Sequence, residues 1–539
     1  MTSTRRWLGL VVIGIAVSLI IVDTTVVNVA IPAIVDDLGI SSTQVQWVQE
    51  SYALVFAALL IAFGTLGDRI GRRRLLLIGV AIFTAASVAA GLAPDGATLI
   101  AARVAQGVGG AMVLPGTMSL INTGFRGRDR TIAFAVWGSI IGGMAALGPL
   151  LGGWLITDFS WRWAFGVNVP FGLFVLAAAV FTIPESKSEH PERFDPVGAL
   201  LGVVAAGVLV FSLIEGRTLG WLTVNERVTI GGWSWPWDLS PTPVLIGVAV
   251  LALVGFLIWE RARERRGAPT LFPLQLFSLQ TFRNGNLVAL IVSLGELGLL
   301  FVLPIWMQNV LGYTPLQAGF ALVALAVGSF LATGMVSGLA RRMTPVGMLR
   351  LGVALELVGV LVLGILLATD TGWPVIAGLL FVYGLGIGLA SSQVTNVVLV
   401  DVPVDRSGQA SGTQSTARQI GSALGVAVLG TVLFGTLGTD LEQRLGDLPD
   451  AQREQVVDIV TGSAGAAIPA LRADASTADA GDLAAESLTA ASSYAAYTAA
   501  GFLAIALAAS ATLRPRRDDA DADAAVEQPA NTTEPATET

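Results

Sequence analysis

The chain has 539 residues but contains no cysteine, a single histidine and a single lysine. The absence of cysteine excludes disulfide bonds, thiol nucleophiles and iron–sulfur clusters. The histidine, His190, lies in a polar stretch, which leaves little basis for histidine catalysis or a zinc site. The sequence also has no nucleophile–base set and no GxxxxGK[ST] phosphate loop, so it predicts neither an enzyme nor an ATP-driven pump.

Charge is scarce as well, because charged residues make up 13% of the chain and apolar residues 54%. This composition excludes an ordinary soluble domain. Repeated apolar runs of about 20 residues predict an all-α polytopic membrane protein. About fourteen such runs are present, at residues 7–32, 47–66, 75–93, 98–121, 131–156, 163–183, 197–214, 243–259, 284–306, 315–339, 349–368, 373–400, 409–437 and 494–513.

Positive charge is concentrated in alternate connections between these runs. The turn GTLGDRIGRRR, Gly64 to Arg74, carries four arginines, and further clusters lie at Phe125 to Arg130 and Arg261 to Arg266. Such segments stay on the cytoplasmic side of a membrane. With an even number of spans, both termini are predicted to be cytoplasmic. Beyond Arg517 the chain consists mainly of Asp, Ala, Glu, Pro and Thr and is predicted to be disordered.

Two long connections are predicted on the opposite side. One, Glu215 to Pro241, contains WSWPWD, whose tryptophans are typical of anchors at a membrane interface. The other, Thr439 to Ser493, is rich in Ala, Asp and Ser and has a helical pattern around Asp450 to Ile468. No site chemistry is visible in the second connection.

Ionisable side chains inside the apolar runs need a reason, because a charge near the bilayer centre costs about 2.5–3.5 kcal/mol. Asp23 and Arg103 reach a similar depth and could pair, either as a structural ion pair or as a proton-exchanging carboxylate tuned by arginine. Glu296 has no charged neighbour in its run and could bind protons or face a cationic ligand. Arg418 is expected to extend toward the cytoplasmic interface. The full set is Asp23, Glu50, Arg103, Glu296, Glu356 and Arg418.

Glycines form the second pattern. The fourth run contains QGVGGA and the fifth contains GSIIGGMAALGPLLGGW. Small residues at this spacing allow helices to approach closely, either as static packing or in a helix that slides. Pro149 is predicted to kink the fifth helix.

Four motifs resemble the major facilitator superfamily, and specifically its 14-helix drug:proton antiporter branch. They are the turn Gly64 to Arg74, DTTVVNVAIP at Asp23 to Pro32, RVAQGVGGAMVLP at Arg103 to Pro115, and GPLLGG at Gly148 to Gly153. The resemblance extends over about residues 7–513. It implies two six-helix bundles at residues 1–184 and 282–513, with an inserted helix pair within 185–281. The distribution of positive charge predicts that the loop at 439–493 is extracellular and that the tail at 514–539 is cytoplasmic.

The resemblance also implies alternating access around a central cavity. It assigns a conformational latch to Asp68, Arg69, Gly71 and Arg72, with Asp68 against Arg72 and the helix start near Ser407 and Gly408. The second half carries only SGLARRMTP at Ser337 to Pro345, which lacks the acid of a second latch.

The sequence therefore predicts a proton-coupled exporter of amphipathic or cationic drugs in a bacterial cytoplasmic membrane, acting as a monomer without cofactor or metal. Proton coupling is assigned to Asp23, Arg103 and Glu296, and the antiporter motif to Gly148, Pro149, Gly152 and Gly153. A substrate cavity is assigned to Asn28, Glu50, Gln106, Trp137, Trp306 and Glu356. The alternative is export of one metabolite, antibiotic, siderophore or lipid, and a channel or scaffold is a different class that the sealed apolar spans disfavour.

Overall fold

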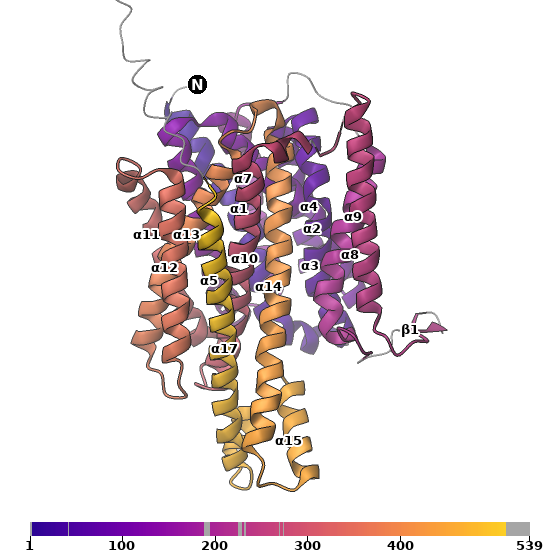
Figure 1. Ribbon diagram of the computed structural model, residues 1–539, viewed down its shortest axis with the longest axis vertical. Coiled ribbons are helices and arrows are strands. Elements are labelled where there is room, and N and C mark those ends of the chain that lie inside the picture. Colours follow the sequence, from indigo (N-terminus) through magenta and orange to yellow (C-terminus); the bar gives the residue numbers. More distant parts are fainter. Residues whose placement is uncertain are drawn as a thin grey trace, which may run out of the picture.

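The structure is a computed structural model, and it describes residues 3–40, 42–187, 195–224, 229–230, 233–268, 270–272 and 274–513. The expected tail at 514–539 and His190 lie outside these residues. The described chain is almost entirely helical and forms one upright bundle (Figure 1). Thirteen of its helices are long and apolar enough to cross a membrane, and the 32-residue helix α5 covers the remaining predicted run. The all-helical fold predicted from the apolar runs is thus confirmed.

The helices are long because apolar runs in lipid must satisfy their backbone hydrogen bonds internally. The first part of the chain forms α1 (Ser3–Leu38), α2 (Ser42–Ile70), α3 (Arg72–Gly91), α4 (Gly96–Gly124), α5 (Gly127–Asp158), α6 (Trp163–Gly166) and α7 (Asn168–Thr182). Within this part, α5 and α7 pack on α1, and α2 and α3 pack on α4.

The last part of the chain forms α10 (Gln280–Asn309), α11 (Pro315–Leu339), α12 (Pro345–Leu366), α13 (Trp373–Leu399), α14 (Ser407–Arg444), α15 (Asp450–Gly462), α16 (Ile468–Ala473) and α17 (Ala478–Ser510). A short 3-10 turn, Val404–Arg406, leads into α14, and another, Leu274–Ser278, precedes α10. Here α10 packs on α14 and α17, and α13 packs on α11 and α12.

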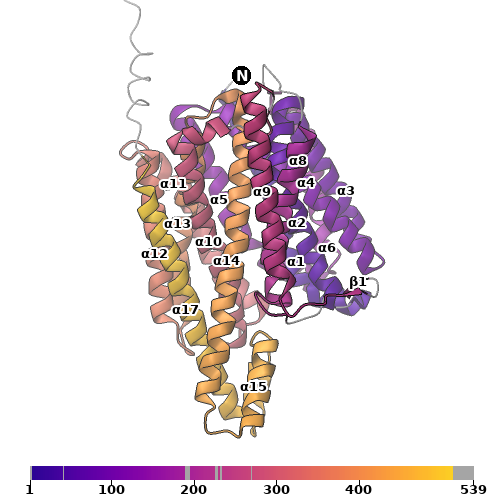
Figure 2. The same cartoon turned by 45° about the vertical axis from the view of Figure 1, so that its right-hand side comes forward.

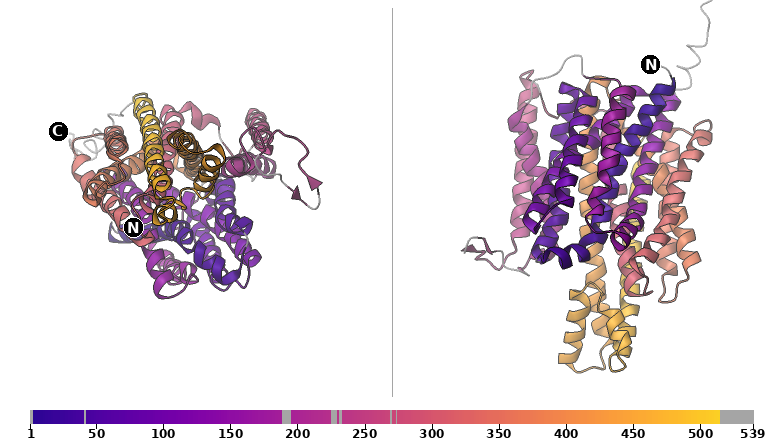
Figure 3. Two further views of the ribbon diagram at one scale, coloured as in Figure 1. Left: turned by 90° about the horizontal axis from the view of Figure 1, so that it is seen from below. Right: turned by 180° about the vertical axis from the view of Figure 1, so that it is seen from behind.

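The middle of the chain forms α8 (Pro196–Leu219) and α9 (Pro241–Arg265), joined by a connection with two-residue strands β1 (Thr229–Ile230) and β2 (Trp233–Ser234). The two helices pack on each other, and α8 also contacts α2 and α14. They stand at the edge of the bundle, and the strands project from its side (Figures 2 and 3).

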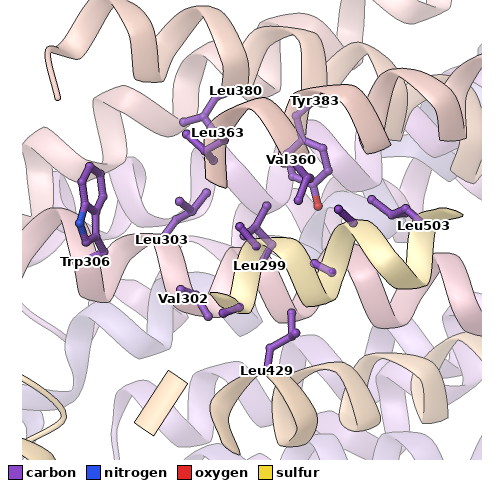
Figure 4. Packing of buried hydrophobic residues seen from close by; sticks show 14 of the residues in the cluster. Leu299, Val302, Leu303, Trp306, Val360, Leu363, Leu380, Tyr383, Leu429 and Leu503 are labelled. Atoms are coloured by element: carbon purple, nitrogen blue, oxygen red, sulfur yellow. The ribbon is translucent and has the colours of Figure 1, made fainter. Parts of the chain in front are cut away.

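A large apolar core fills the last part of the chain. Leu299 and Leu303 of α10 meet Val360 of α12, Leu380 of α13 and Leu429 of α14, and each of these side chains is fully buried (Figure 4). In lipid such contacts act through close packing rather than through removal of water. This core makes α10, α12, α13, α14 and α17 a single packed unit.

The connection at 439–493 differs most from the sequence reading, because most of it is helical. α14 continues to Arg444 and α17 begins at Ala478, so both extend beyond the neighbouring helices, and α15 packs beside them (Figure 1). Arg444 joins the two long helices, since it pairs with Glu486 of α17 at 2.7 Å, and within α14 it also pairs with Asp440 at 2.6 Å. The predicted runs end where the apolar composition ends, whereas the helices continue beyond that point.

One end of the bundle carries the turn at Gly64 to Arg74, the start of α1 and the end of α17, and we call it the basic end (Figure 1). At this end α2 and α14 approach closely through glycines. A Cβ added at Gly412 would lie 2.8 Å from the carbonyl oxygen of Leu60 and 3.3 Å from the Cα of Gly64. The backbones of the two parts of the chain are thus in direct contact.

We expect Gly412→Leu to destabilise this contact, because overpacking a close helix crossing costs about 1–3 kcal/mol. The measurement is the thermal midpoint of the purified protein. Gly435→Leu is the matched control, since the same helix has open space within 4 Å of that position. Equal thermal midpoints for the two variants would contradict a contribution of this contact to stability.

Candidate functional site

The carboxylate of Asp68 holds the start of α14 against α2. Its two oxygens accept hydrogen bonds from the backbone N–H groups of Gly408 and Gln409, each at 2.9 Å. Arg72 donates to the same carboxylate from Nε at 2.9 Å and from Nη2 at 2.7 Å. The N–H groups at a helix start are unsatisfied donors with partial positive charge, so an anion is stabilised there. Asp68 therefore links two parts of the chain that are far apart in sequence.

Arg72 and Gly71 shape the same turn. The Arg72 guanidinium is buried and also donates from Nη2 to the carbonyl oxygen of Val404 at 2.7 Å. Gly71 has φ of 114°, and a Cβ there would lie 2.6 Å from the carboxylate of Glu185. The positive φ favours glycine between α2 and α3, because a residue with a Cβ rarely adopts it. Arg69, the fourth residue assigned to the latch, is exposed.

A second buried carboxylate, Asp23 of α1, lies inside the first part of the chain. Arg103 of α4 donates from Nη1 to its Oδ2 at 2.5 Å. Gln106 and Asn168 donate to its Oδ1 at 2.9 and 2.8 Å. Arg103 also donates to the carbonyl oxygen of Val48 at 3.0 Å. We call this group the Asp23 cluster, and its charges balance as one carboxylate to one guanidinium.

Further side chains complete the Asp23 cluster. The hydroxyl of Ser87 accepts from Gln106 at 2.9 Å and from Asn168 at 3.2 Å. The guanidinium of Arg103 lies 4.4 Å from the centre of the Tyr52 ring, within the range of a cation–π contact. Five helices, α1, α2, α3, α4 and α7, thus meet at this cluster. Asp23 as a carboxylate has all the donors that it needs, and a neutral Asp23 would lose its electrostatic attraction to arginine.

Three members of this cluster are absent from the sequence prediction. Asn168 interrupts the apolar run GVNVPFGLF, and this polar residue is the one signal that the sequence offered. Ser87 and Tyr52 resemble ordinary residues of a transmembrane helix. Their importance comes from the packing of α3 and α2 on α4, which no local pattern reveals.

A third group of buried ionisable residues lies in the last part of the chain, and it corrects two predictions. Glu296 of α10 is not isolated, because Arg418 of α14 lies with its Nη2 3.7 Å from Glu296 Oε2. Arg418 accordingly does not extend to the interface, and it donates to the hydroxyl of Ser391 at 3.2 Å. That hydroxyl donates to Glu296 Oε1 at 2.9 Å. The sequence could not show this group, because it depends on α10 packing against α14.

Glu356 of α12 belongs to the same group rather than to the Asp23 cluster. It is fully buried, and its carboxyl lies within hydrogen-bonding reach of the carboxyl of Glu296. The hydroxyl of Tyr383 donates to the backbone oxygen of Glu296 at 3.1 Å and closes the group from α13. We call Glu296, Glu356, Arg418, Ser391 and Tyr383 the Glu296 cluster.

The residues assigned to a substrate cavity are not gathered in one place. Gln106 belongs to the Asp23 cluster and Glu356 to the Glu296 cluster. Glu50 is half-buried in α2, and the side chain of Asn28 lies outside the described residues. The assigned residues therefore do not outline one cavity in this conformation.

The two tryptophans assigned to the cavity lie in packed interiors. Trp137 is fully buried, and its indole nitrogen donates to the hydroxyl of Thr117 at 3.2 Å. Trp306 is also fully buried, in the core of Figure 4, and donates to the hydroxyl of Thr489 at 3.1 Å. Buried indoles with satisfied N–H groups are typical of core packing.

The glycines of GPLLGG set the approach of α5 to α1. A Cβ at Gly148 would overlap the side chain of Thr25, and a Cβ at Gly152 would lie 3.2 Å from Cγ1 of Val26. Thr25 and Val26 lie two and three residues after Asp23 on α1. The close α1–α5 crossing and the Asp23 cluster thus share one segment of α1.

On its other side α5 contacts α11. A Cβ at Gly153 would lie 3.7 Å from Leu316, and nearer the basic end Ser329 donates to the backbone oxygen of Ser139 at 3.2 Å. The side chain of Pro149 lies outside the described residues. α5 therefore packs between α1 and the last part of the chain.

Two solved transporters share this architecture. The human organic anion transporter MFSD10 (TETRAN) aligns with a TM-score of 0.59 and 13% identity, over 95% of this chain and 100% of its own. The proton:xylose symporter XylE aligns with a TM-score of 0.56 and 14% identity, over 87% of this chain and 96% of its own. At such identities the likeness concerns the fold alone.

Comparison with similar sequences identifies the family. The family model of the Major Facilitator Superfamily matches residues 13–426. A probable actinorhodin transporter of Streptomyces coelicolor is 36% identical, over 82% of this chain and 75% of its own. The multidrug resistance protein Stp of Mycobacterium tuberculosis is 33% identical, over 86% and 82%. A tetracenomycin C resistance and export protein of Streptomyces glaucescens is 34% identical, over 80% and 77%.

The chain belongs to the Major Facilitator Superfamily, as the four motifs predict. It is a multi-pass protein of a bacterial cell membrane.

Proposed function

We propose that this protein exports drugs or antibiotics across the cytoplasmic membrane in exchange for protons. The observation that carries the proposal is the Asp23 cluster, in which a fully buried carboxylate is paired with Arg103 inside an apolar bundle. An intramembrane carboxylate with a fixed counter-charge is typical of a proton relay. The relatives are named for actinorhodin transport, multidrug resistance and tetracenomycin C resistance and export, and these names support the direction and the kind of substrate.

The moving parts in this proposal are two helical halves, residues 1–184 and 282–513. The helix pair within 185–281 is an insertion at the edge of the bundle, the segment 439–493 is an extracellular extension, and residues 514–539 form a cytoplasmic tail. The packing of α1 to α7 among themselves and of α10 to α17 among themselves supports the division. One chain contains both halves, so a monomer without cofactor suffices.

The basic end faces the cytoplasm in this proposal, because arginine-rich connections are retained there. The contacts of Asp68 with α14 and of Gly412 with α2 then close the cytoplasmic side. The conformation accordingly corresponds to a carrier whose cytoplasmic entrance is shut. Opening that entrance requires the two hydrogen bonds to the start of α14 to break.

Proton binding acts on this arrangement through α1. A proton on Asp23 removes the charge that Arg103 attracts and weakens the bonds that tie α1 to α4 and α7. The next residues of α1 contact Gly148 and Gly152 of α5, and α5 contacts α11. A change in charge at Asp23 thus has a continuous path of packed helices to the second half.

A second candidate is the export of a single antibiotic or other metabolite. It is favoured by the relatives that are named for one compound, actinorhodin or tetracenomycin C. Both candidates use the same proton chemistry, so a panel of compounds separates them. Efflux of several unrelated compounds supports multidrug export, whereas efflux of one supports the second candidate.

The test is efflux of a cationic dye such as ethidium from loaded cells that express the protein, with and without a pH gradient. We expect efflux that stops when an ionophore collapses the gradient while ATP is kept constant. Cells with the empty vector are the control. Efflux that is unchanged after collapse of the gradient would contradict proton coupling.

A further inference from the structure

The Glu296 cluster has more acid than base. Within the described residues it brings together the carboxyls of Glu296 and Glu356 and the single guanidinium of Arg418. The remaining titratable group that faces them is Tyr383, a neutral phenol on α13. The Asp23 cluster, by contrast, balances one carboxylate with one guanidinium. Two ionised glutamates would leave one negative charge without a partner in a region where such a charge is strongly disfavoured.

The Glu296 cluster also has too few hydrogen-bond donors for its two carboxyls. Neither oxygen of Glu356 accepts a hydrogen bond from any described donor, although the side chain is fully buried. The carboxyl of Glu296 lies within hydrogen-bonding reach of it, and two carboxylates have no hydrogen to place between them. One proton on either carboxyl would supply the missing donor. It would also make the cluster neutral.

Arg418 supplies the positive charge of the Glu296 cluster. Its Nη2 faces Glu296 and Ser391, while its Nη1 is buried without a hydrogen-bond partner among the described residues. The guanidinium is permanently charged, so it serves as a constant counter-charge to the pair. The cluster therefore has two simple states, with one proton and neutral, or without a proton and negative.

We propose that Glu296 and Glu356 share one proton in this conformation, and that they form a proton-binding site in the second half separate from Asp23. The inference rests on the proposed function for its role in transport but on the geometry alone for the proton. It assigns Glu356 to proton binding rather than to a substrate cavity. It also places the proton held in this conformation on the glutamate pair rather than on Asp23, whose carboxyl is matched by the single guanidinium of Arg103.

The proposal can be tested by removing one glutamate, because the cluster then has one carboxyl for its one guanidinium. In Glu356→Gln the remaining Glu296 has Arg418 to itself, so it no longer needs a proton. Glu296→Gln leaves Glu356 and Arg418 in the same balance. Either variant keeps the size of the side chain and avoids a buried guanidinium without an acid.

The experiment is infrared difference spectroscopy of the purified full-length protein at neutral pH, which detects the C=O stretch of protonated carboxyls. We expect the wild-type band to lose the intensity of one carboxyl in Glu356→Gln and in Glu296→Gln. The band should be unchanged in Asp23→Asn and in the control Glu454→Gln, whose side chain is exposed on α15. Circular dichroism and the thermal midpoint show whether each variant is folded.

The inference is overturned if the band is unchanged in both glutamate variants, or if it is lost in Asp23→Asn instead. Because two single variants test the same pair, a folding defect in one leaves the other decisive. The dye assay separates this result from the proposed function. Gradient-driven efflux by the wild-type protein together with an unchanged band would refute the shared proton and keep proton-coupled export.

Discussion

Replacing Asp23 by asparagine is expected to abolish efflux driven by a pH gradient. Asparagine cannot exchange a proton, and its NH₂ group would face Gln106 and Asn168, which are themselves donors. Arg103 would remain buried without its acid, and breaking a buried ion pair in this way costs about 3–5 kcal/mol. The measurement is uphill dye transport into everted membrane vesicles under an imposed pH gradient, normalised to the amount of protein in the membrane.

The matched control for this variant is Asp37→Asn, on the same helix. Asp37 is also paired with an arginine, Arg162, but the pair is exposed. Hydrogen bonds from Arg162 and Trp161 lower the pKa of Asp37, so it stays ionised at neutral pH and has no proton to exchange. We expect this control to transport like the wild type. Uphill transport by Asp23→Asn at the rate of the control would show that Asp23 is not a coupling residue.

Replacing Asp68 by asparagine is expected to open the basic end of the bundle. The carboxylate accepts two backbone N–H groups of α14 and pairs with Arg72. Hydrogen bonds to a charged group are worth about 1.5–3 kcal/mol each, and loss of one is enough to shift a conformational equilibrium by roughly tenfold or more. We therefore expect loss of the closed conformation and a fall in efflux of at least about tenfold.

The absence of native cysteine makes this opening directly measurable. Spin labels on cysteines introduced at Arg74 and Asp405, which are exposed on the two sides of the contact, report the distance across it. We expect a short distance in the wild type and a longer, broader distribution in Asp68→Asn. Asp129→Asn is the control, because Asp129 forms a half-exposed ion pair with Arg6 in the first part of the chain. The same short distance in Asp68→Asn would contradict the role of the contact as a latch.

The sequence predicted the helices well because apolar runs in lipid have few other ways to satisfy their backbone. It also brought Asp23 and Arg103 together, since two charges at one depth in different helices have a strong reason to meet. The arrangement of Asp68 at the start of α14 followed from a motif that resembles a known family. In each case the prediction depends on a single residue or a short motif that the sequence shows directly.

The sequence did not predict the contacts that depend on which helices pack against each other. Glu296 and Arg418 meet because α10 lies along α14, and neither run carries a sign of that neighbour. Asn168 becomes a partner of Asp23 only when α7 packs on α1. Apart from the helical pattern around Asp450 to Ile468, the sequence does not predict the helices of the extension at 439–493, because they lie beyond the apolar runs. There, pairing of Arg444 with Glu486 joins the extended ends of α14 and α17, which composition alone does not predict.

The central claim is that movement of substrate and movement of protons are obligatorily linked. The direct measurement uses sealed proteoliposomes with a pH-sensitive dye inside, no imposed pH gradient, an ionophore to clamp the membrane potential, and a gradient of a transported compound across the membrane. We expect protons to move opposite to the compound in the wild type and to remain still in Asp23→Asn. Movement of the compound through the wild-type protein without any movement of protons would contradict the account.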